Sequence, residues 1–146
     1  IDSLAPDRQK LTFSSDVLFP DCSAALTDQG KRLLLGIGRV LGGQQNAFES
    51  IQVEGHTDRK RTGNARCTYA TNWELSSQRA TTVVRLISDS TNVQKPKLSA
   101  IGRAEFHPVA GSERDDPGSY ARNRRIEITL QYSRKDSTTI GKNDSH

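Results

Sequence analysis

Two segments of the chain alternate between apolar and polar positions, which is the pattern of a β-strand with one buried face. Residues 51–56 and 126–131 each carry an apolar residue or glycine at every second position. Short apolar runs at residues 11–13 and 17–19, ended by Pro20, predict a first strand, and residues 98–101 predict a short third one. The chain is therefore expected to build a sheet from segments far apart in sequence.

Two other segments repeat their hydrophobic residues at helical spacing. The first runs from Leu33 to Leu41, after Thr27 and Asp28 as cap residues, and the glycines at 42–43 end it. The second begins with a Thr-x-x-Glu capping box at residues 71–74 and continues to about residue 87, and a helical turn is expected at 119–122. The order β-α-β-α-β-(α)-β predicts an α/β fold with at least one parallel strand pair and helices on one face of the sheet.

Length and composition fit one domain with a modest core. The chain has 146 residues, of which 33% are hydrophobic, and its mean hydropathy is −0.68. We expect the domain at residues 11–132, with a linker or N-terminal extension at 1–10 and a polar, flexible tail at 133–146. No run approaches the roughly 18 to 20 apolar residues that span a bilayer. Since the chain opens with Ile rather than Met, we expect a targeting or anchoring segment to be missing from it.

Lys and Arg outnumber Asp and Glu by 21 to 17, which gives a net charge of +4 and a pI near 9.3. This balance permits binding to a polyanion. However, aromatic residues make up only 5% of the chain, and no stacking platform or recognition helix is evident, so nucleic acid is not an expected partner. The basic residues from Arg59 to Arg66 are interpreted as solvated loop charge.

Cys22 and Cys67 each lie in a predicted loop close to the start of a helix. An even number of cysteines suits an oxidising compartment, so a Cys22–Cys67 disulfide is predicted. Two unpaired cysteines, packed as small hydrophobic residues, are the alternative.

Three polar side chains are not required by local structure. Asp58 follows a strand, Asn72 lies at a helix N-terminus, and Arg79 lies one turn beyond Leu75 on the same helix. Spacing alone favours a structural Asp58–Arg79 salt bridge. The functional alternative is a clamp for a zwitterion, in which Arg79 binds a ligand carboxylate and Asp58 accepts hydrogen bonds from the adjacent ammonium.

Catalysis is not expected. The only three histidines, His56, His107 and His146, lack the spacing of zinc ligands. No nucleophile elbow, P-loop or pair of catalytic carboxylates is evident, and no metal or other cofactor is predicted.

Three separated motifs resemble those of OmpA-like domains, in the right order and over about residues 11–130: 53–58 (VEGHTD), 72–80 (NWELSSQRA) and 123–128 (NRRIEI). The NWELS form is most similar to the flagellar stator subunit MotB and its relatives. The resemblance implies a βαβαβ(α)β sandwich, with a four-stranded mixed sheet and helices packed on one face. It also implies non-covalent binding of peptidoglycan.

In that family, the motif residues matching Asp58 and Arg79 contact the diaminopimelate of the stem peptide. The resemblance also carries over Asn72 and Arg124, and with less support Thr57 and the loop from Asp16 to Leu18. Two loops depart from the family pattern: Ser119-Tyr120 replaces the usual Gly-Arg pair, and residues 59–71 form a long loop with Cys67.

The resemblance further implies a periplasmic domain of an inner-membrane-anchored protein, a homodimer, and a membrane partner subunit. The system served stays open between an ion-driven motor or stator, an outer-membrane tether, and an antiphage motor of the Zorya type.

Overall fold

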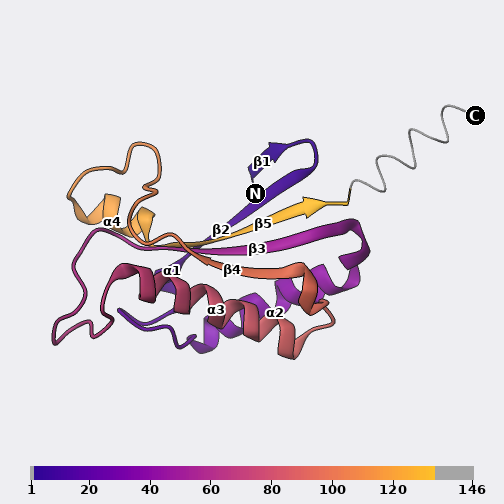
Figure 1. The fold of residues 1–146 in the computed structure, drawn as a ribbon, viewed down its shortest axis with the longest axis horizontal. Helices are drawn as coiled ribbons and strands as arrows, with labels where there is room; N and C mark the ends of the chain where they lie inside the picture. Colours follow the sequence, from indigo (N-terminus) through magenta and orange to yellow (C-terminus); the bar gives the residue numbers. More distant parts are fainter. Residues whose placement is uncertain (1, 134–146) are drawn as a thin grey trace, which may run out of the picture.

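A five-stranded sheet in the order β1-β2-β5-β3-β4 frames the domain in the computed structural model, which describes residues 2–133 (Figure 1). Beyond Ser133, the tail expected at 133–146 lies outside the described residues. The strands are β1 (Asp2–Ala5), β2 (Arg8–Ser14), β3 (Phe48–His56), β4 (Leu98–Gly102) and β5 (Arg125–Tyr132). The helices are α1 (Ser15–Leu18), α2 (Asp28–Gly43), α3 (Asn72–Ser90) and α4 (Pro117–Asn123), with short 3-10 turns η1 (Gln45–Ala47) and η2 (Lys95–Lys97).

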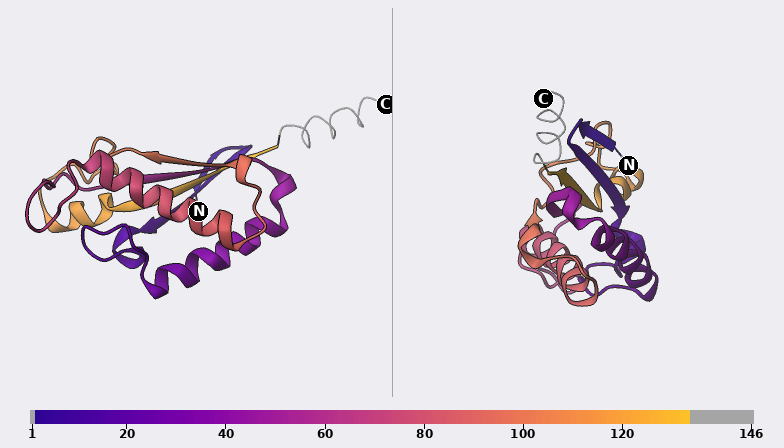
Figure 2. Two further views of the ribbon diagram at one scale, coloured as in Figure 1. Left: turned by 60° about the horizontal axis from the view of Figure 1, so that its bottom comes forward. Right: turned by 90° about the vertical axis from the view of Figure 1, so that its right-hand side faces the viewer.

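The sheet is mixed, as predicted. Strands β3 and β4 are parallel and are joined through α3, whereas β5 pairs antiparallel with both β2 and β3. Helices α2 and α3 lie side by side on one face of the sheet (Figure 2). The predicted layer arrangement is therefore confirmed.

Two expectations for the N-terminal part require correction. Residues 2–10 were expected to be a linker, but β1 pairs with the first half of β2 in a hairpin, which adds a fifth strand to the predicted four. Residues 17–19 were expected to be a strand, but the chain turns into helix α1 after Ser14, whose side chain accepts a hydrogen bond from the amide of Asp16 at 3.3 Å. This turn buries Leu18 and Phe19 in the core without a second strand segment.

The core lies between the sheet and the two long helices. Helix α2 is capped by Thr27, whose Oγ1 accepts a hydrogen bond from the amide of Gly30 at 2.9 Å, and α3 starts with the predicted capping box of Thr71 and Glu74. The alternating positions of β3 and β5 point their apolar side chains toward these helices. The fully buried residues include Leu34, Ile51, Val53, Val83, Ile87, Ile126 and Ile128.

Two glycines let the start of α3 approach the ends of β3 and β4 closely. A Cβ atom at Gly55 would overlap the carbonyl oxygen of Ser76, and one at Gly102 would overlap the side chain of Ser77. The first two turns of α3 are thus held at the carboxyl end of β3, and this contact positions the site described below.

None of the helices within residues 2–133 has the length and apolar character that crossing a membrane requires.

Candidate functional site

A cavity of about 210 Å³ opens at the carboxyl end of β3. Its walls come from the loop between α1 and α2, the loop of residues 59–71, the start of α3, and the end of α4. The lining residues are Asp21, Cys22, Thr57, Asp58, Lys60, Arg61, Thr62, Asn64, Arg66, Cys67, Asn72, Leu75, Arg79 and Arg124. Five of the seven predicted site residues are therefore brought together on one cavity, from three separate parts of the chain: the turn after β3, helix α3 and the end of α4.

Asp58 lies two residues beyond the end of β3 and is only 8% exposed. Its Oδ1 accepts a hydrogen bond from the backbone amide of Lys60 at 3.0 Å, and its Oδ2 accepts one from Nη1 of Arg124 at 2.7 Å. The preceding residue, Thr57, donates its backbone amide to Ala104 and its hydroxyl to the carbonyl of Asp58. The carboxylate is thus fixed in place, and its two oxygens keep lone pairs free for a further donor.

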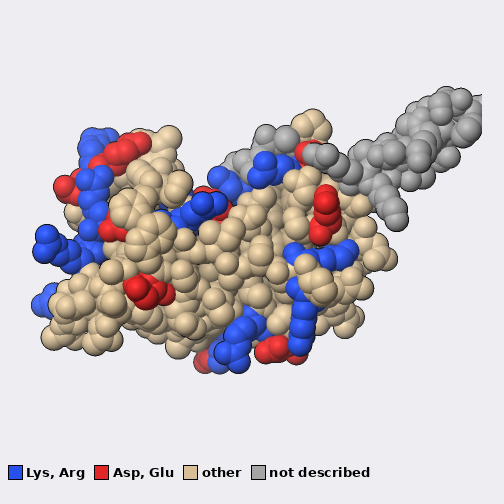
Figure 3. All heavy atoms as spheres, in the orientation of Figure 1, with Lys and Arg blue, Asp and Glu red and all other residues tan. Residues whose placement is uncertain are grey.

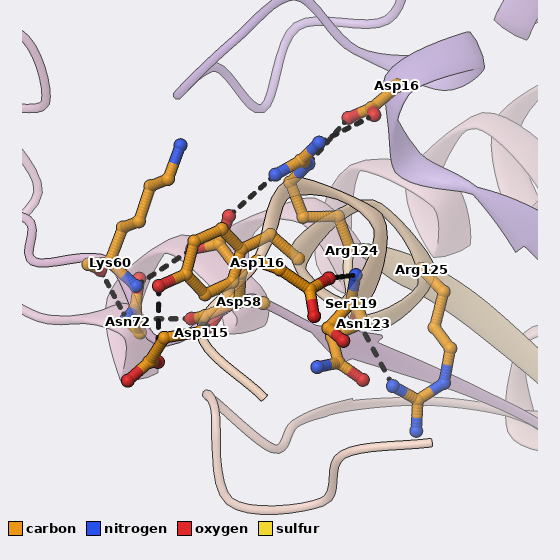
Figure 4. Close-up of polar contacts among 12 residues, drawn as sticks. Asp16, Asp58, Lys60, Asn72, Asp115, Asp116, Ser119, Asn123, Arg124 and Arg125 are labelled. Atoms are coloured by element: carbon orange, nitrogen blue, oxygen red, sulfur yellow. Dashed lines mark hydrogen bonds and ion pairs between the residues drawn. The ribbon is translucent and has the colours of Figure 1, made fainter. Parts of the chain in front are cut away.

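Arg124 joins Asp58 to Asp16, as the dashed lines in Figure 4 show. Its Nε and Nη2 donate to the two oxygens of Asp16 at 2.9 and 3.0 Å, a bidentate contact. The hydrogen bonds to Asp16, and after them those to Asp58, raise the pKa of Arg124 although its partial burial opposes this. Asp16 does not line the cavity, so its contribution to the site passes through Arg124.

Arg79 is a buried cation whose side-chain contacts are backbone carbonyls and a ring. It is 4% exposed, its Nε donates to the carbonyl of Ser23 at 2.8 Å, and its Nη2 donates to that of Pro20 at 3.3 Å. The guanidinium lies 5.0 Å from the ring centroid of Phe19. Within residues 2–133 no carboxylate pairs with it, and no hydrogen bond uses its Nη1. Burial lowers the pKa of Arg79 because the charged form loses solvation.

These contacts exclude the structural salt bridge between Asp58 and Arg79 that spacing alone favoured. The carboxylate of Asp58 is paired with Arg124 instead. Removing a cation from water without an anionic partner is costly, so a buried arginine facing a cavity favours the binding of an anion there.

Asn72 lines the cavity, as the resemblance implied, whereas Leu18 does not. The Nδ2 of Asn72 donates to the carbonyls of Asp58 and Lys60, at 3.3 and 3.1 Å, and to Oε2 of Glu105 at 3.3 Å. Asn72 therefore holds the turn after β3 in place, and also lines the cavity. Leu18 is fully buried in the core and does not line the cavity, because α1 turns its side chain inward.

The predicted disulfide between Cys22 and Cys67 is present, with the two Cα atoms 5.5 Å apart. Both cysteines line the cavity, so the bond joins two of its walls. The loop of residues 59–71 is consequently part of the site. This corrects the interpretation of its basic residues as solvated loop charge alone, since Lys60, Arg61 and Arg66 also line the cavity. In the sequence, the position of Cys67 inside that loop indicates that the loop is tied to another part of the domain.

A second polar cluster lies on the sheet face opposite the helices. The Nε2 atom of His56 is 3.4 Å from Oε2 of Glu54 and 3.6 Å from Oε1 of Glu127. These three residues could hold a metal ion by their spacing, but Arg103 already pairs with Glu54 at 2.9 Å and Arg125 with Glu127 at 2.7 Å. Lys10 also lies 3.6 Å from Glu127, so the cluster is a network of ion pairs in which a metal ion would have to compete with two arginines and a lysine.

The sequence model of the OmpA family matches residues 18–124. The uncharacterized protein YtxE of Bacillus subtilis is 31% identical over 128 residues, which cover 88% of this chain and 50% of that protein. The chain spans about half the length of the curated relatives it matches. The cell wall anchor of the T6SS from Pseudomonas aeruginosa superposes with a TM-score of 0.75 and 32% identity, over 88% of this chain and 85% of that chain. A protein from Desulfovibrio vulgaris described as MotB like gives a TM-score of 0.76 and 25% identity, over 86% and 74%.

Proposed function

Because the chain belongs to the OmpA family, we propose that it binds cell-wall peptidoglycan without covalent chemistry, through the zwitterionic end of the diaminopimelate in a stem peptide. The observation that carries this proposal is the pair of unlike charges on one cavity: Arg79, which pairs with no carboxylate of residues 2–133, and Asp58, whose oxygens keep lone pairs free. A group with an ammonium and a carboxylate on the same carbon matches both.

Each site residue then has a specific task. Arg79 donates to the ligand carboxylate through the Nη1 that no other contact uses, while its Nε and Nη2 stay on the carbonyls of Ser23 and Pro20. Asp58 accepts from the ligand ammonium. Arg124 and Asn72 hold Asp58 and its turn in position, so little order has to be gained on binding.

The role in the cell that we propose is to anchor a larger assembly to the wall. The likeness to a cell wall anchor and to a MotB like protein supports this, since both share the fold over most of this chain. We further propose a periplasmic location, a homodimer, and an inner-membrane, ion-driven complex as the assembly. An upstream transmembrane helix bearing an acidic residue would support that complex, whereas a lipobox or a barrel would support an outer-membrane tether.

The test is co-sedimentation of the purified domain with peptidoglycan sacculi. We expect Asp58→Ala and Arg79→Ala to abolish sedimentation, because the loss of one partner of a buried charged contact costs about 2 to 5 kcal/mol of binding. Asp89→Ala and Arg85→Ala are matched controls, since both residues are exposed on α3 and neither lines the cavity. Normal sedimentation of folded Asp58→Ala and Arg79→Ala would overturn the clamp.

Competition by stem tripeptides tests the chemistry of the ligand. L-alanyl-γ-D-glutamyl-diaminopimelate should displace the domain from sacculi, and the same peptide with lysine at its third position should not, because the acylated lysine offers only a side-chain amine without an adjacent carboxylate. Equal competition by both would contradict a site that recognises the zwitterion.

A further inference from the structure

Three basic side chains of the loop at 59–71 line the cavity and are not used by the clamp. Lys60, Arg61 and Arg66 are exposed, and no ion pair among the described residues engages them. Their neighbour Arg59 differs, because it pairs with Asp115 at 3.3 Å and does not line the cavity. Figure 3 shows Lys and Arg side chains at the left end of the molecule, with Asp and Glu side chains among them, and the loop lies at this end in Figure 1.

The loop that carries these residues is held in place. The disulfide ties Cys67 to Cys22 on the opposite wall of the cavity. Next to it, Oδ1 of Asn64 accepts hydrogen bonds from the backbone amides of Arg66 and Cys67 at 3.0 and 2.9 Å. On the other side of the loop, Nζ of Lys60 lies 5.2 Å from the ring centroid of Tyr120. These contacts therefore keep the basic groups around the cavity, whereas a mobile loop would not hold them there.

The cavity lining carries more basic side chains than are needed to bind a zwitterion. Five basic side chains line it, namely Lys60, Arg61, Arg66, Arg79 and Arg124, against the carboxylates of Asp21 and Asp58. The lining thus carries a net charge of +3, or +2 when Asp16, which pairs with Arg124 from outside the lining, is included, while the zwitterionic end of diaminopimelate carries none. A ligand that complements this surface brings at least one more negative charge, close to the end that the clamp binds.

We propose that Lys60, Arg61 and Arg66 bind a second carboxylate of the same stem peptide, the free α-carboxylate of the γ-linked glutamate that precedes diaminopimelate. The domain then selects stem peptides with this carboxylate free over those in which it is amidated. The amide has nearly the same size and shape, so the selection acts through charge. This inference rests on the proposed function.

The first test compares two synthetic peptides by isothermal titration calorimetry: L-alanyl-γ-D-glutamyl-diaminopimelate and its counterpart with D-isoglutamine. We expect the amidated peptide to bind roughly tenfold more weakly, because it loses a few exposed charge contacts, each of which contributes little. Equal affinity for the two peptides overturns this inference and leaves the clamp standing. Binding of neither peptide overturns the proposed function and this inference with it.

The second test assigns the effect to the loop. The triple variant Lys60→Gln/Arg61→Gln/Arg66→Gln is expected to lose roughly tenfold affinity for the glutamate peptide, with affinity for the isoglutamine peptide unchanged. The control Arg32→Gln/Arg39→Gln/Arg85→Gln removes the same charge from exposed positions on α2 and α3 and should alter neither affinity. An equal loss for both peptides in the loop variant, with an unchanged thermal melt, would contradict a specific carboxylate contact.

Discussion

Asp58 and Arg79 line the same cavity, but the carboxylate of Asp58 is bound by Arg124 at 2.7 Å and forms no ion pair with Arg79. The two charges of the proposed clamp are therefore held by different partners. Arg79 is oriented by the carbonyls of Pro20 and Ser23, and Asp58 by Arg124 and the amide of Lys60. Each can contact a ligand without first breaking a bond to the other.

Replacing Arg124 tests whether the orientation of Asp58 matters. Arg124→Gln removes the contact to Asp58 and the bidentate contact to Asp16, so we expect affinity for a diaminopimelate peptide to fall by about 1.5 to 3 kcal/mol. The free energy of unfolding should fall by about 1 to 3 kcal/mol, because the half-exposed contact to Asp16 contributes little but the buried Asp58 keeps only the amide of Lys60. Calorimetry and urea unfolding measure the two effects. Arg114→Gln, exposed on the loop before α4, is the control, and wild-type affinity in Arg124→Gln would refute the orienting role.

Arg79→Lys separates charge from geometry. Lysine keeps the positive charge, but its single ammonium cannot reach the carbonyls of Ser23 and Pro20 while also contacting a ligand. We expect binding to fall at least tenfold, and the free energy of unfolding to fall by about 1 to 3 kcal/mol. A lysine variant that binds as the wild type does would show that only charge is required at this position.

Reduction of the disulfide is expected to destabilise the domain. The bond closes a loop between cysteines 45 residues apart, which in the chain-entropy model contributes about 4 kcal/mol to the free energy of unfolding. Urea unfolding with and without a reductant measures the difference. The double variant Cys22→Ser/Cys67→Ser is the control and should unfold identically in both conditions. Two free thiols in the native, unreduced protein would contradict the bond.

The cluster behind the sheet makes stability depend on pH. Burial alone would lower the pKa of His56, but the nearby carboxylates of Glu127 and Glu54 outweigh burial and raise that pKa above 6.5. The hydrogen bond to His56 lowers the pKa of Glu54. Burial alone would raise the pKa of Glu127, but the neighbouring His56 and the hydrogen bond from Arg125 hold it well below the usual range.

The directions of these pKa shifts determine the pH range in which the cluster stabilises the fold. Protonated His56 stabilises the fold fully below pH 6.5 and loses this effect as the pH rises through its raised pKa, while the two glutamates contribute above 4.5 and lose their effect in acid. His56→Gln should therefore lower the free energy of unfolding more at about pH 5.5 than at about pH 8.5. His107→Gln, an exposed neighbour 6.1 Å away between ring centroids, is the control. A cost of His56→Gln that is equal at both pH values would contradict this account.

Gly55→Ala tests the close contact that places α3 beside the site. The new Cβ would overlap the carbonyl oxygen of Ser76, which belongs to the helix backbone and cannot move alone. We expect a loss of about 1 to 3 kcal/mol in the free energy of unfolding, measured by urea denaturation. Gly36→Ala on α2 is the matched control, because nothing lies within 4 Å of its Cβ position, and it should be neutral or stabilising. An unchanged free energy of unfolding in Gly55→Ala would show that α3 can move away from β3 at little cost.

The sequence by itself determined the elements whose signals are local. Alternation at residues 51–56 and 126–131 marks β3 and β5, and the capping box at Thr71 and Glu74 marks the start of α3, because side-chain periodicity and helix caps act over a few residues. The resemblance then named seven candidate site residues, five of which line the cavity, and the two cysteines predicted the disulfide.

Only the tertiary structure decided which of these residues meet and in what role. Residues 2–10 became part of a hairpin because β2 pairs along its whole length with β5, a strand more than 100 residues away. Asp58 is paired with Arg124, and Arg79 binds backbone carbonyls, because the partner of a charged side chain depends on which chain segments fold beside it. The basic loop at 59–71 likewise forms a wall of the cavity because the fold places it beside the loop that carries Cys22.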